Sequence, residues 1–214
     1  MRDHQDRLLQ NLKTLPLLAS LRGLTLAEVV PIGHALKIAG WSLVDVPLNS
    51  PQPLASIERM ATAFPDHMVG AGMVMSMADV RNVRAAGAAL VVSPHVDAGI
   101  IRTARDLGLA CLPGVATPTE AYTALGAGAS ALLLVPAELI TPAVVRAFRA
   151  LLPPLVPLLV GGGVTLEVMG DYLSAGASGF AIGAALYRPG DSAAAVAVAA
   201  GVFATSLEAA SERL

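Results

Sequence analysis

A run of three glycines, Gly161-Gly162-Gly163, combines residue types and spacing that suit one kind of ligand. An apolar run over residues 156–160 precedes it and predicts a buried strand, and a helical pattern begins near Leu166. Glycines between a strand and a helix let the backbone come close to a ligand, and the helix start offers unpaired N–H groups and the positive end of a dipole. The stretch therefore predicts a phosphate-binding loop, although a flexible turn without a ligand has the same composition.

Composition limits the kinds of partner that the protein can have. The chain has 214 residues, a net charge of -2 and a pI near 6.1, and it has no stretch of clustered Lys and Arg. Binding to nucleic acid needs such clusters to neutralise phosphates, so we exclude nucleic acid as the main partner. The single cysteine, Cys111, excludes an internal disulfide and lies in an apolar segment typical of a core. We expect no cofactor.

The mean hydropathy of +0.65 raises the question of a membrane segment. The uncharged windows at residues 121–137 and 150–166 are each about 17 residues long, at the lower limit for a spanning helix, and the second contains several prolines and glycines. Residues 1–11 are charged and lack the apolar centre of a secretory signal. We therefore expect a cytoplasmic protein without a membrane partner.

The elements that must position the glycine run repeat along the chain as an apolar strand, a polar turn and a helix of about a dozen residues. The apolar strands are continuous rather than alternating, which is typical of a parallel sheet with both faces covered. Eight such units predict a (βα)8 TIM barrel, whereas the alternative, an open doubly wound sheet, does not require eight evenly spaced units. We expect one domain over residues 1–214, with residues 1–14 as a lead-in and residues 191–214 as a closing helix. The predicted strands span residues 16–21, 43–47, 68–72, 90–93, 109–112, 131–135, 156–160 and 179–182.

Helix boundaries support this arrangement. Thr117, Pro118 and Glu120 have the spacing of an N-cap, a first-turn proline and a capping box. Thr25 and Glu28 repeat the capping-box spacing. We therefore assign both glutamates to helix starts rather than to catalysis.

In such a barrel, catalytic and binding residues lie at the carboxyl ends of the strands. The loops after the seventh and eighth strands often form a phosphate site, and here they contain Gly162 and Gly163, and Gly183 and Ala184. This placement favours the phosphate interpretation of the glycine run. The other strand-end candidates are Arg22, Asp45, Asn49, Met73, Pro94, His95 and Leu133. As strand-end residues, Arg22, Asn49, Met73 and Pro94 are candidates for contact with a substrate.

Several short motifs occur together in an order that resembles the 2-keto-3-deoxy-6-phosphogluconate and phosphogalactonate aldolases. The resemblance covers residues 15–188, and residues 47–51 (PLNSP) are similar to the phosphogalactonate branch. No single motif is specific, but the combination is. The matching segments are residues 21–23 (LRG), 44–51 (VDVPLNSP), 70–72 (GAG), 92–94 (VSP), 113–117 (PGVAT), 160–165 (VGGGVT) and 186–188 (LYR).

The resemblance implies a class I aldolase that cleaves a phosphorylated 2-keto-3-deoxy sugar acid to pyruvate and glyceraldehyde 3-phosphate, usually as a homotrimer. In that family a lysine on the sixth strand forms a Schiff base with pyruvate, and a glutamate on the second strand moves protons. An arginine on the first strand and a threonine on the third help to hold the keto acid. Carried over, these four roles fall on Leu133, Asp45, Arg22 and Met73, in that order.

Two of these four residues lack the chemistry that the family uses. Leucine has no amine, so Leu133 cannot form an imine with a carbonyl group. The chain has only two lysines, Lys13 before the first strand and Lys37 in the first barrel helix, and neither is expected to reach the strand ends. Met73 replaces a hydroxyl by a thioether, and Asp45 is one methylene shorter than the family's glutamate, which changes its reach by roughly an ångström. The Schiff-base route is therefore predicted to be lost.

Three functions follow as hypotheses. In the first, the protein is an aldolase by descent, inactive or weakened by the Schiff-base route, that still binds a phosphorylated or carboxylated keto acid or inorganic phosphate. In the second, it is a non-catalytic paralogue that binds a phosphometabolite or forms oligomers, and it acts through subunit contacts. In the third, it is a metal-assisted lyase with Asp45 and His95 as two ligands and no evident third. Glu138 would weaken anion binding if it faced the phosphate loop, but we expect it to face solvent.

Overall fold

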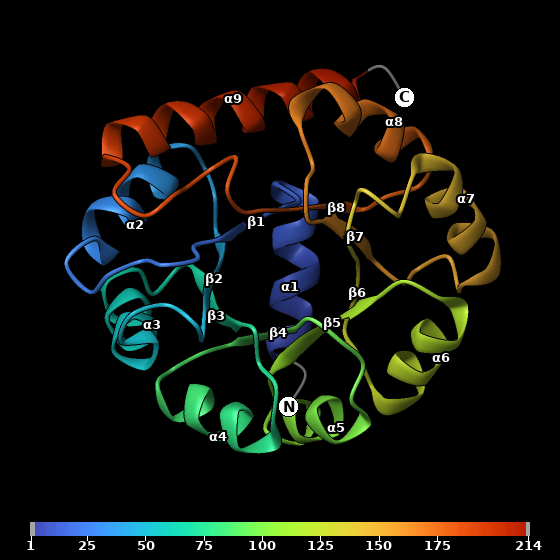
Figure 1. Ribbon diagram of the computed structural model, residues 1–214, viewed down its shortest axis with the longest axis horizontal. Coiled ribbons are helices and arrows are strands. Elements are labelled where there is room, and N and C mark those ends of the chain that lie inside the picture. The colour runs from blue at the N-terminus through green and yellow to red at the C-terminus, as the bar shows by residue number, and fades with distance from the viewer. Residues whose placement is uncertain (1–2, 213–214) are drawn as a thin grey trace.

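The computed structural model describes residues 3–212, and eight parallel strands form a closed barrel at its centre (Figure 1). Each strand pairs with the next one along the chain, and the last strand closes the ring by pairing with the first, with Leu17 opposite Phe180. Helices surround the ring and cover the outer face of the sheet. The structure confirms the (βα)8 barrel and excludes the open doubly wound sheet.

The strands are short and almost entirely buried, as the apolar runs predict. Four of them have the predicted bounds, and the fifth continues three residues further than predicted, to Val115. The first, sixth and seventh differ from prediction by one or two residues at their ends. The strands are β1 (Leu17–Ser20), β2 (Leu43–Pro47), β3 (Met68–Gly72), β4 (Leu90–Ser93), β5 (Ala110–Val115), β6 (Leu132–Leu134), β7 (Leu158–Gly161) and β8 (Gly179–Ile182).

Several helices begin at side chains that cap them. Thr117 Oγ1 accepts a hydrogen bond from the Glu120 amide, and the Glu120 carboxylate accepts one of 2.9 Å from the Thr117 amide, which confirms the predicted capping box. The helices are α1 (Asp3–Thr14), α2 (Val29–Ile38), α3 (Pro53–Ala63), α4 (Met77–Ala85), α5 (Ala98–Asp106), α6 (Pro118–Ala127), α7 (Pro142–Leu151), α8 (Met169–Ser174) and α9 (Ala193–Ser211), and a 3-10 turn, η1 (Leu166–Val168), precedes α8.

The second predicted capping box does not start a helix at Thr25. The Glu28 carboxylate accepts hydrogen bonds from both the amide and the hydroxyl of Thr25, but a turn follows and α2 begins only at Val29. Glu28 itself stands at the cap position and provides no side-chain cap. The pair therefore holds the loop between β1 and α2, and the predicted helix start was wrong.

The segment expected to be a lead-in forms α1, which lies within the outline of the strand ring in Figure 1. Leu8 is fully buried and Leu12 partly buried, and both pack in the cluster of side chains that fills the barrel interior. Their spacing of four residues places them on the same face of the helix. Because α1 fills the end of the barrel where the strands begin, the interior opens only at the carboxyl ends of the strands.

α9 packs along the outside of the barrel against α2 and α8. Trp41 Nε1 donates a hydrogen bond of 3.1 Å to the Ala200 carbonyl oxygen, and Phe203 packs edge-on against the Trp41 ring. Among residues 3–212, α9 is the one helix long and apolar enough to cross a membrane, with a mean hydropathy of 1.7 over a window that is 28% buried. This is weak evidence for a membrane segment, since a core helix can have the same composition.

Alternation along the strands decides which side chains enter the barrel. Leu43 of β2 and Leu133 of β6 belong to the interior cluster, and Leu159 of β7 lies beside Leu133 in register. Successive side chains of a strand point to opposite faces, so Asp45, two residues after Leu43, also points inward. Ser20 of β1 is its register partner. The sheet thus places one carboxylate inside an otherwise apolar barrel, near the open end.

The close approach of β3 and β4 can be tested at Gly70. A Cβ atom at this position would lie 2.5 Å from the Leu90 carbonyl oxygen and 2.6 Å from Leu90 Cβ. We predict that Gly70→Ala lowers the free energy of unfolding in urea by about 1–3 kcal/mol, because the strand backbones must separate.

Gly126→Ala in α6 is the matched control for this prediction. Nothing lies within 4 Å of a Cβ atom at Gly126, and helix propensity predicts a gain of up to about 1 kcal/mol. Equal stabilities of the two variants would contradict the close packing of β3 against β4.

Candidate active site

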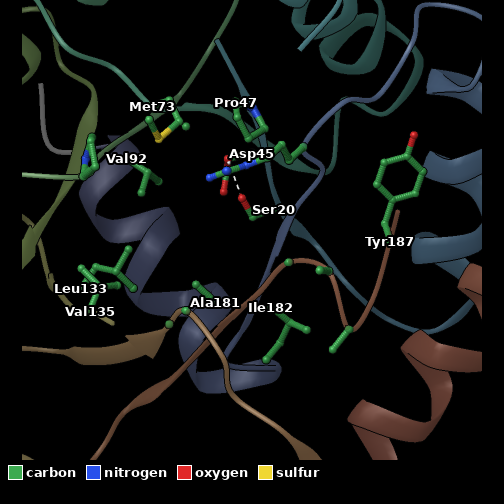
Figure 2. A pocket seen from close by; sticks show the side chains of 18 of the residues that line it. Ser20, Asp45, Pro47, Met73, Val92, Leu133, Val135, Ala181, Ile182 and Tyr187 are labelled. Carbon is green, nitrogen blue, oxygen red and sulfur yellow. Dashed lines mark hydrogen bonds between the residues drawn. The ribbon is translucent and has the colours of Figure 1, made fainter. Parts of the chain in front are cut away.

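The carboxyl ends of the strands surround a cavity of about 580 Å³ (Figure 2). A cavity of this size suits a small organic ligand. Its lining combines residues from the ends of the strands with residues from the loops after β7 and β8. The sequence-predicted residues that it brings together are Arg22, Asp45, Met73, Pro94, Leu133, Gly162, Gly163, Gly183 and Ala184.

Asp45 is the buried carboxylate of this cavity, with 1% of its surface exposed. Ser20 Oγ donates a hydrogen bond of 3.2 Å to Asp45 Oδ1, as Figure 2 shows. Burial raises the pKa of Asp45 to about 7, while the Ser20 hydrogen bond and the positive charge of Arg22 act in the opposite direction. A carboxyl group with this pKa can give up or accept a proton near neutral pH, as acid/base chemistry requires.

Leu133 lies in the same cavity and directs its side chain inward from β6 (Figure 2). It is 7% exposed and pairs in register with Gly114 of β5 and Leu159 of β7. Its Cδ1 atom packs beside Gly161, at the end of β7. The residue at the position predicted for the reactive lysine therefore faces the site, and it offers only hydrocarbon.

Arg22 and Met73 border the cavity with different chemistry. Arg22 is exposed at the end of β1, and its charge reaches Asp45. Met73 follows β3 directly and extends its thioether toward the cavity (Figure 2). Its backbone φ of 54° lies in the left-handed region, which is uncommon for residues other than glycine and costs energy. Arg22 therefore remains a candidate anion contact, whereas Met73 contributes an apolar surface.

The glycine run forms a loop held against the chain after β6. Gly162 and Gly163 have φ values of 76° and 92°, a backbone conformation that glycine adopts without strain. The Ala137 amide donates hydrogen bonds to the carbonyl oxygens of Gly161, at 2.9 Å, and Gly162, at 2.8 Å. The helix expected after this loop is reduced to η1 and the six residues of α8, so its dipole is small. Any anion held here would depend on the loop backbone more than on a long helix.

Glu138 stands beside this loop, outside the cavity lining. It is exposed, as expected, but a Cβ atom at Gly163 would lie 2.5 Å from Glu138 Oε1, so its carboxylate lies directly against the loop. The expectation that this residue simply faces solvent was therefore incomplete. Its negative charge acts against a second anion bound on the other side of the loop.

Two sequence-predicted candidates do not join the cavity lining. Asn49 is exposed in the turn after β2, while the neighbouring Ser50 is buried and accepts a hydrogen bond of 2.9 Å from the Gly23 amide. His95 lies beyond the end of β4, with Nδ1 3.3 Å from Ser93 Oγ. Over residues 3–212 the structure places no three His, Cys, Asp or Glu side chains where they could hold a metal ion together. Asp45 and His95 thus gain no third ligand in that part of the chain.

Sequence reasoning missed Ser20 and Arg188 as site residues. Ser20 is the last residue of β1 and pairs in register with Asp45, so its position at a strand end was a usable signal. Arg188 lines the cavity from the loop after β8, where Arg188 Nε donates a hydrogen bond of 3.1 Å to the Ala184 carbonyl oxygen. It belongs to one of the matching motifs, but no role was assigned to it.

The closed barrel and the cavity at its strand ends define a (βα)8 barrel protein with a small-molecule site of the usual placement. Comparison with known proteins then identifies the family. The family model for KDPG and KHG aldolases matches residues 8–196. The chain belongs to this aldolase family, and the resemblance seen in the sequence is confirmed.

Individual relatives agree with this assignment. The probable 2-dehydro-3-deoxy-6-phosphogalactonate aldolase of Rhizobium meliloti is 41% identical over 179 residues, which cover 83% of this chain and 84% of that protein. The 2-dehydro-3-deoxy-6-phosphogalactonate aldolase of Escherichia coli is 40% identical over 179 residues, 83% of this chain and 87% of that protein. A solved structure of native KDPGal is 38% identical and superimposes with a TM-score of 0.91, covering 92% of this chain and 97% of that one.

The buried carboxylate predicts a pH dependence of stability that Asp45→Asn removes. Because the pKa rises from 3.8 in the unfolded chain to about 7 in the barrel, the folded state holds the proton more tightly. Below about pH 4, Asp45 is protonated in both states and the wild-type fold has its full stability. As the pH rises toward 7, the unfolded state loses this proton first, so the folded state loses stability relative to it. We predict that the free energy of unfolding falls by up to about 1.4 kcal/mol per pH unit in this interval.

Urea unfolding of the wild type and Asp45→Asn between pH 4 and 8 checks this slope. The asparagine variant should lack the contribution and should be the more stable of the two at pH 8. Parallel pH profiles for the two proteins would show that Asp45 is not protonated in the manner described. Asp106→Asn is the control, because it changes an exposed carboxylate. Asp97→Asn is a poor control, because Asp97 caps α5.

Proposed function

We propose that this protein is an aldolase-family barrel that binds a small anionic keto acid at its mouth and does not cleave it through a Schiff base. The observation that carries the proposal is the side chain of Leu133, which faces the cavity from β6. The family resemblance implies a lysine at this position. Class I cleavage begins with attack of an amine lone pair on the substrate carbonyl, followed by loss of water, and leucine has neither lone pair nor exchangeable proton.

Neither of the two lysines of the chain can replace the lysine that the family resemblance implies at position 133. Lys13 is exposed in the last turn of α1, at the closed end of the barrel, and Lys37 is exposed in the last turn of α2, on the outer ring. Neither residue lines the cavity. The guanidinium groups of Arg22 and Arg188 are delocalised cations and do not act as nucleophiles.

The remaining groups support ligand binding. Arg22 and Arg188 supply positive charge at the cavity, and the glycine loop after β7 supplies a backbone that a ligand can approach closely. Asp45 retains a pKa suited to proton transfer, although without an imine it has no electron sink to work with. The relatives named as phosphogalactonate aldolases support a keto sugar acid or its phosphate as the first class of ligand to test.

Reductive trapping tests the loss of the Schiff base in the wild-type protein. We predict that incubation with pyruvate and borohydride leaves the intact mass of the protein unchanged, because no cavity residue supplies an imine nitrogen. Mass spectrometry of the whole protein is the measurement. A covalent pyruvate adduct on the wild-type chain would overturn the proposal.

Restoring the amine tests whether the rest of the scaffold is intact. We predict that Leu133→Lys, combined with Met73→Thr and Asp45→Glu, forms a trappable pyruvate adduct and raises aldol cleavage about a hundredfold or more above wild type. The apolar surroundings would lower the pKa of the new amine and so favour its neutral, nucleophilic form.

Leu155→Lys is the matched control, since Leu155 is 93% exposed and lies outside the cavity. It should give no adduct and no gain in cleavage. If the triple variant folds, by circular dichroism, but forms no adduct, then position 133 is not where the family's chemistry takes place.

A further inference from the structure

The interior of the cavity is mainly hydrocarbon. Apolar side chains from β4, β6 and β8, and from the residues that directly follow β3 and β6, line it, and Figure 2 labels them. Val92 and Leu133 are each more than nine-tenths buried and belong to the interior cluster, so they form the inner wall rather than the rim. The apolar wall consists of Met73, Val92, Leu133, Val135 and Ala181.

Three hydroxyl-bearing residues border the cavity, and each is engaged or turned away. Ser20 donates its hydroxyl hydrogen to Asp45 Oδ1 at 3.2 Å, and Ser93 donates its own to the His95 carbonyl oxygen at 2.9 Å. The Tyr187 hydroxyl points away from the centre of the cavity in Figure 2. Burial raises the pKa of Tyr187, and the negative charge of Glu28 raises it further. Within residues 3–212, the Ser20 and Ser93 hydroxyls are thus engaged, and the Tyr187 hydroxyl, although it has no hydrogen-bond partner, does not face the centre of the cavity.

The charged groups of the cavity suit one acid group. Arg22 is exposed at the mouth, and Arg188 uses Nε to bond the Ala184 carbonyl oxygen, which leaves its terminal nitrogens for an anion. Asp45 is the one cavity-lining carboxylate, and its partner in the structure is Ser20. A carboxylate at the mouth beside the arginines would satisfy the positive charge, and the body of the ligand would then extend against the apolar wall.

A polyhydroxylated body fits this wall poorly. Each hydroxyl that leaves water without a new partner costs about 1–3 kcal/mol. Each methylene that leaves water for such a wall gains close to a kcal/mol, or about a fourfold increase in affinity. Among acids with the same head group and chain length, hydroxyl groups therefore lower the affinity for this wall and methylene groups raise it.

We propose that the ligand of this site is a 2-keto carboxylic acid with a hydrocarbon body, held by its acid group at Arg22 and by its chain against the apolar wall. This inference rests on the proposed function, since it takes a keto acid bound at the barrel mouth as its starting point. It replaces the sugar chain of the family's substrates by an unsubstituted aliphatic chain as the preferred body.

Titration calorimetry of the wild-type protein with a matched pair of acids tests the inference. The pair is 2-oxohexanoate and 4,5,6-trihydroxy-2-oxohexanoate, which share head group and chain length and differ only in their hydroxyl groups. The 6-phosphate of the second acid and pyruvate complete the set. We expect 2-oxohexanoate to bind at least tenfold more tightly than the trihydroxy acid and its phosphate, and more tightly than pyruvate.

The outcomes separate this inference from the proposed function. Tighter binding of the trihydroxy acid or its phosphate would overturn the hydrocarbon body while supporting a keto-acid site. Binding of none of the four acids at millimolar concentration would overturn both. Equal binding of 2-oxohexanoate and pyruvate would also overturn the inference, because the chain would then gain nothing from the wall.

Variants locate the site without depending on activity. Val135→Thr replaces a methyl group of the wall by a hydroxyl of the same shape, and it should weaken 2-oxohexanoate several-fold while leaving pyruvate unchanged. Arg22→Met should weaken both acids about equally. Val198→Thr makes the same exchange on the outer face of α9, where Val198 is 68% exposed, and should change neither affinity. An equal loss for Val135→Thr and Val198→Thr would contradict binding at the wall.

Discussion

The closed ring of strands imposes the constraint on which the rest of the structure depends. Once eight strands pair in parallel around a barrel, alternate side chains of every strand must share the interior. A residue cannot leave this interior without shifting its whole strand, because a one-residue slip would exchange the inner and outer faces. Asp45 is therefore buried by the register of β2 with β1 and β3. Leu133 enters the cavity for the same reason on β6.

This constraint explains how the barrel accepts different side chains at its interior positions. A leucine in the inner layer packs well against Gly161 and neighbouring hydrocarbon, so the barrel does not require a lysine at position 133. The Asp45 carboxylate, by contrast, destabilises the fold when it is charged, because a charge inside the barrel loses its hydration. Gly72 leaves the space that the Asp45 carboxylate occupies, and Ser20 supplies its hydrogen bond. The residues at positions 45 and 133 are thus subject to different physical constraints.

Much of this architecture could be predicted because it depends on local patterns. The continuous apolar runs gave the positions of the strands, and the order of the strands followed from their even spacing. α1 was missed because its sequence is polar overall, and only Leu8 and Leu12 mark the face that enters the barrel. The start of α2 was wrong because the Thr25–Glu28 pair has capping-box chemistry but closes a loop.

The candidate site was predictable as far as strand-end position decides it. Asp45 and Leu133 were predicted at strand ends, and both line the cavity because the register of β2 and β6 directs them inward. Asn49 lies one turn beyond β2, where loop geometry rather than register decides direction, and it faces solvent. The hydrogen bond from Ser20 to Asp45 joins two strands, so neither segment alone contains it. The left-handed backbone of Met73 is likewise set by the tertiary contacts around it.

α1, which fills the end of the barrel where the strands begin, affects proton exchange at Asp45. Within residues 3–212, α1 packs into the end of the barrel where the strands begin, and the cavity that contains Asp45 lies at the carboxyl ends of the strands. A ligand seated there would separate the carboxyl group from bulk water and make its ionised form still less favourable. Occupancy and protonation are then linked: near pH 7 the protein takes up a fraction of a proton as the cavity fills, and the heat of binding varies with the ionisation enthalpy of the buffer. Because α1 closes one end of the barrel, binding of a ligand at the other end is coupled to protonation of Asp45.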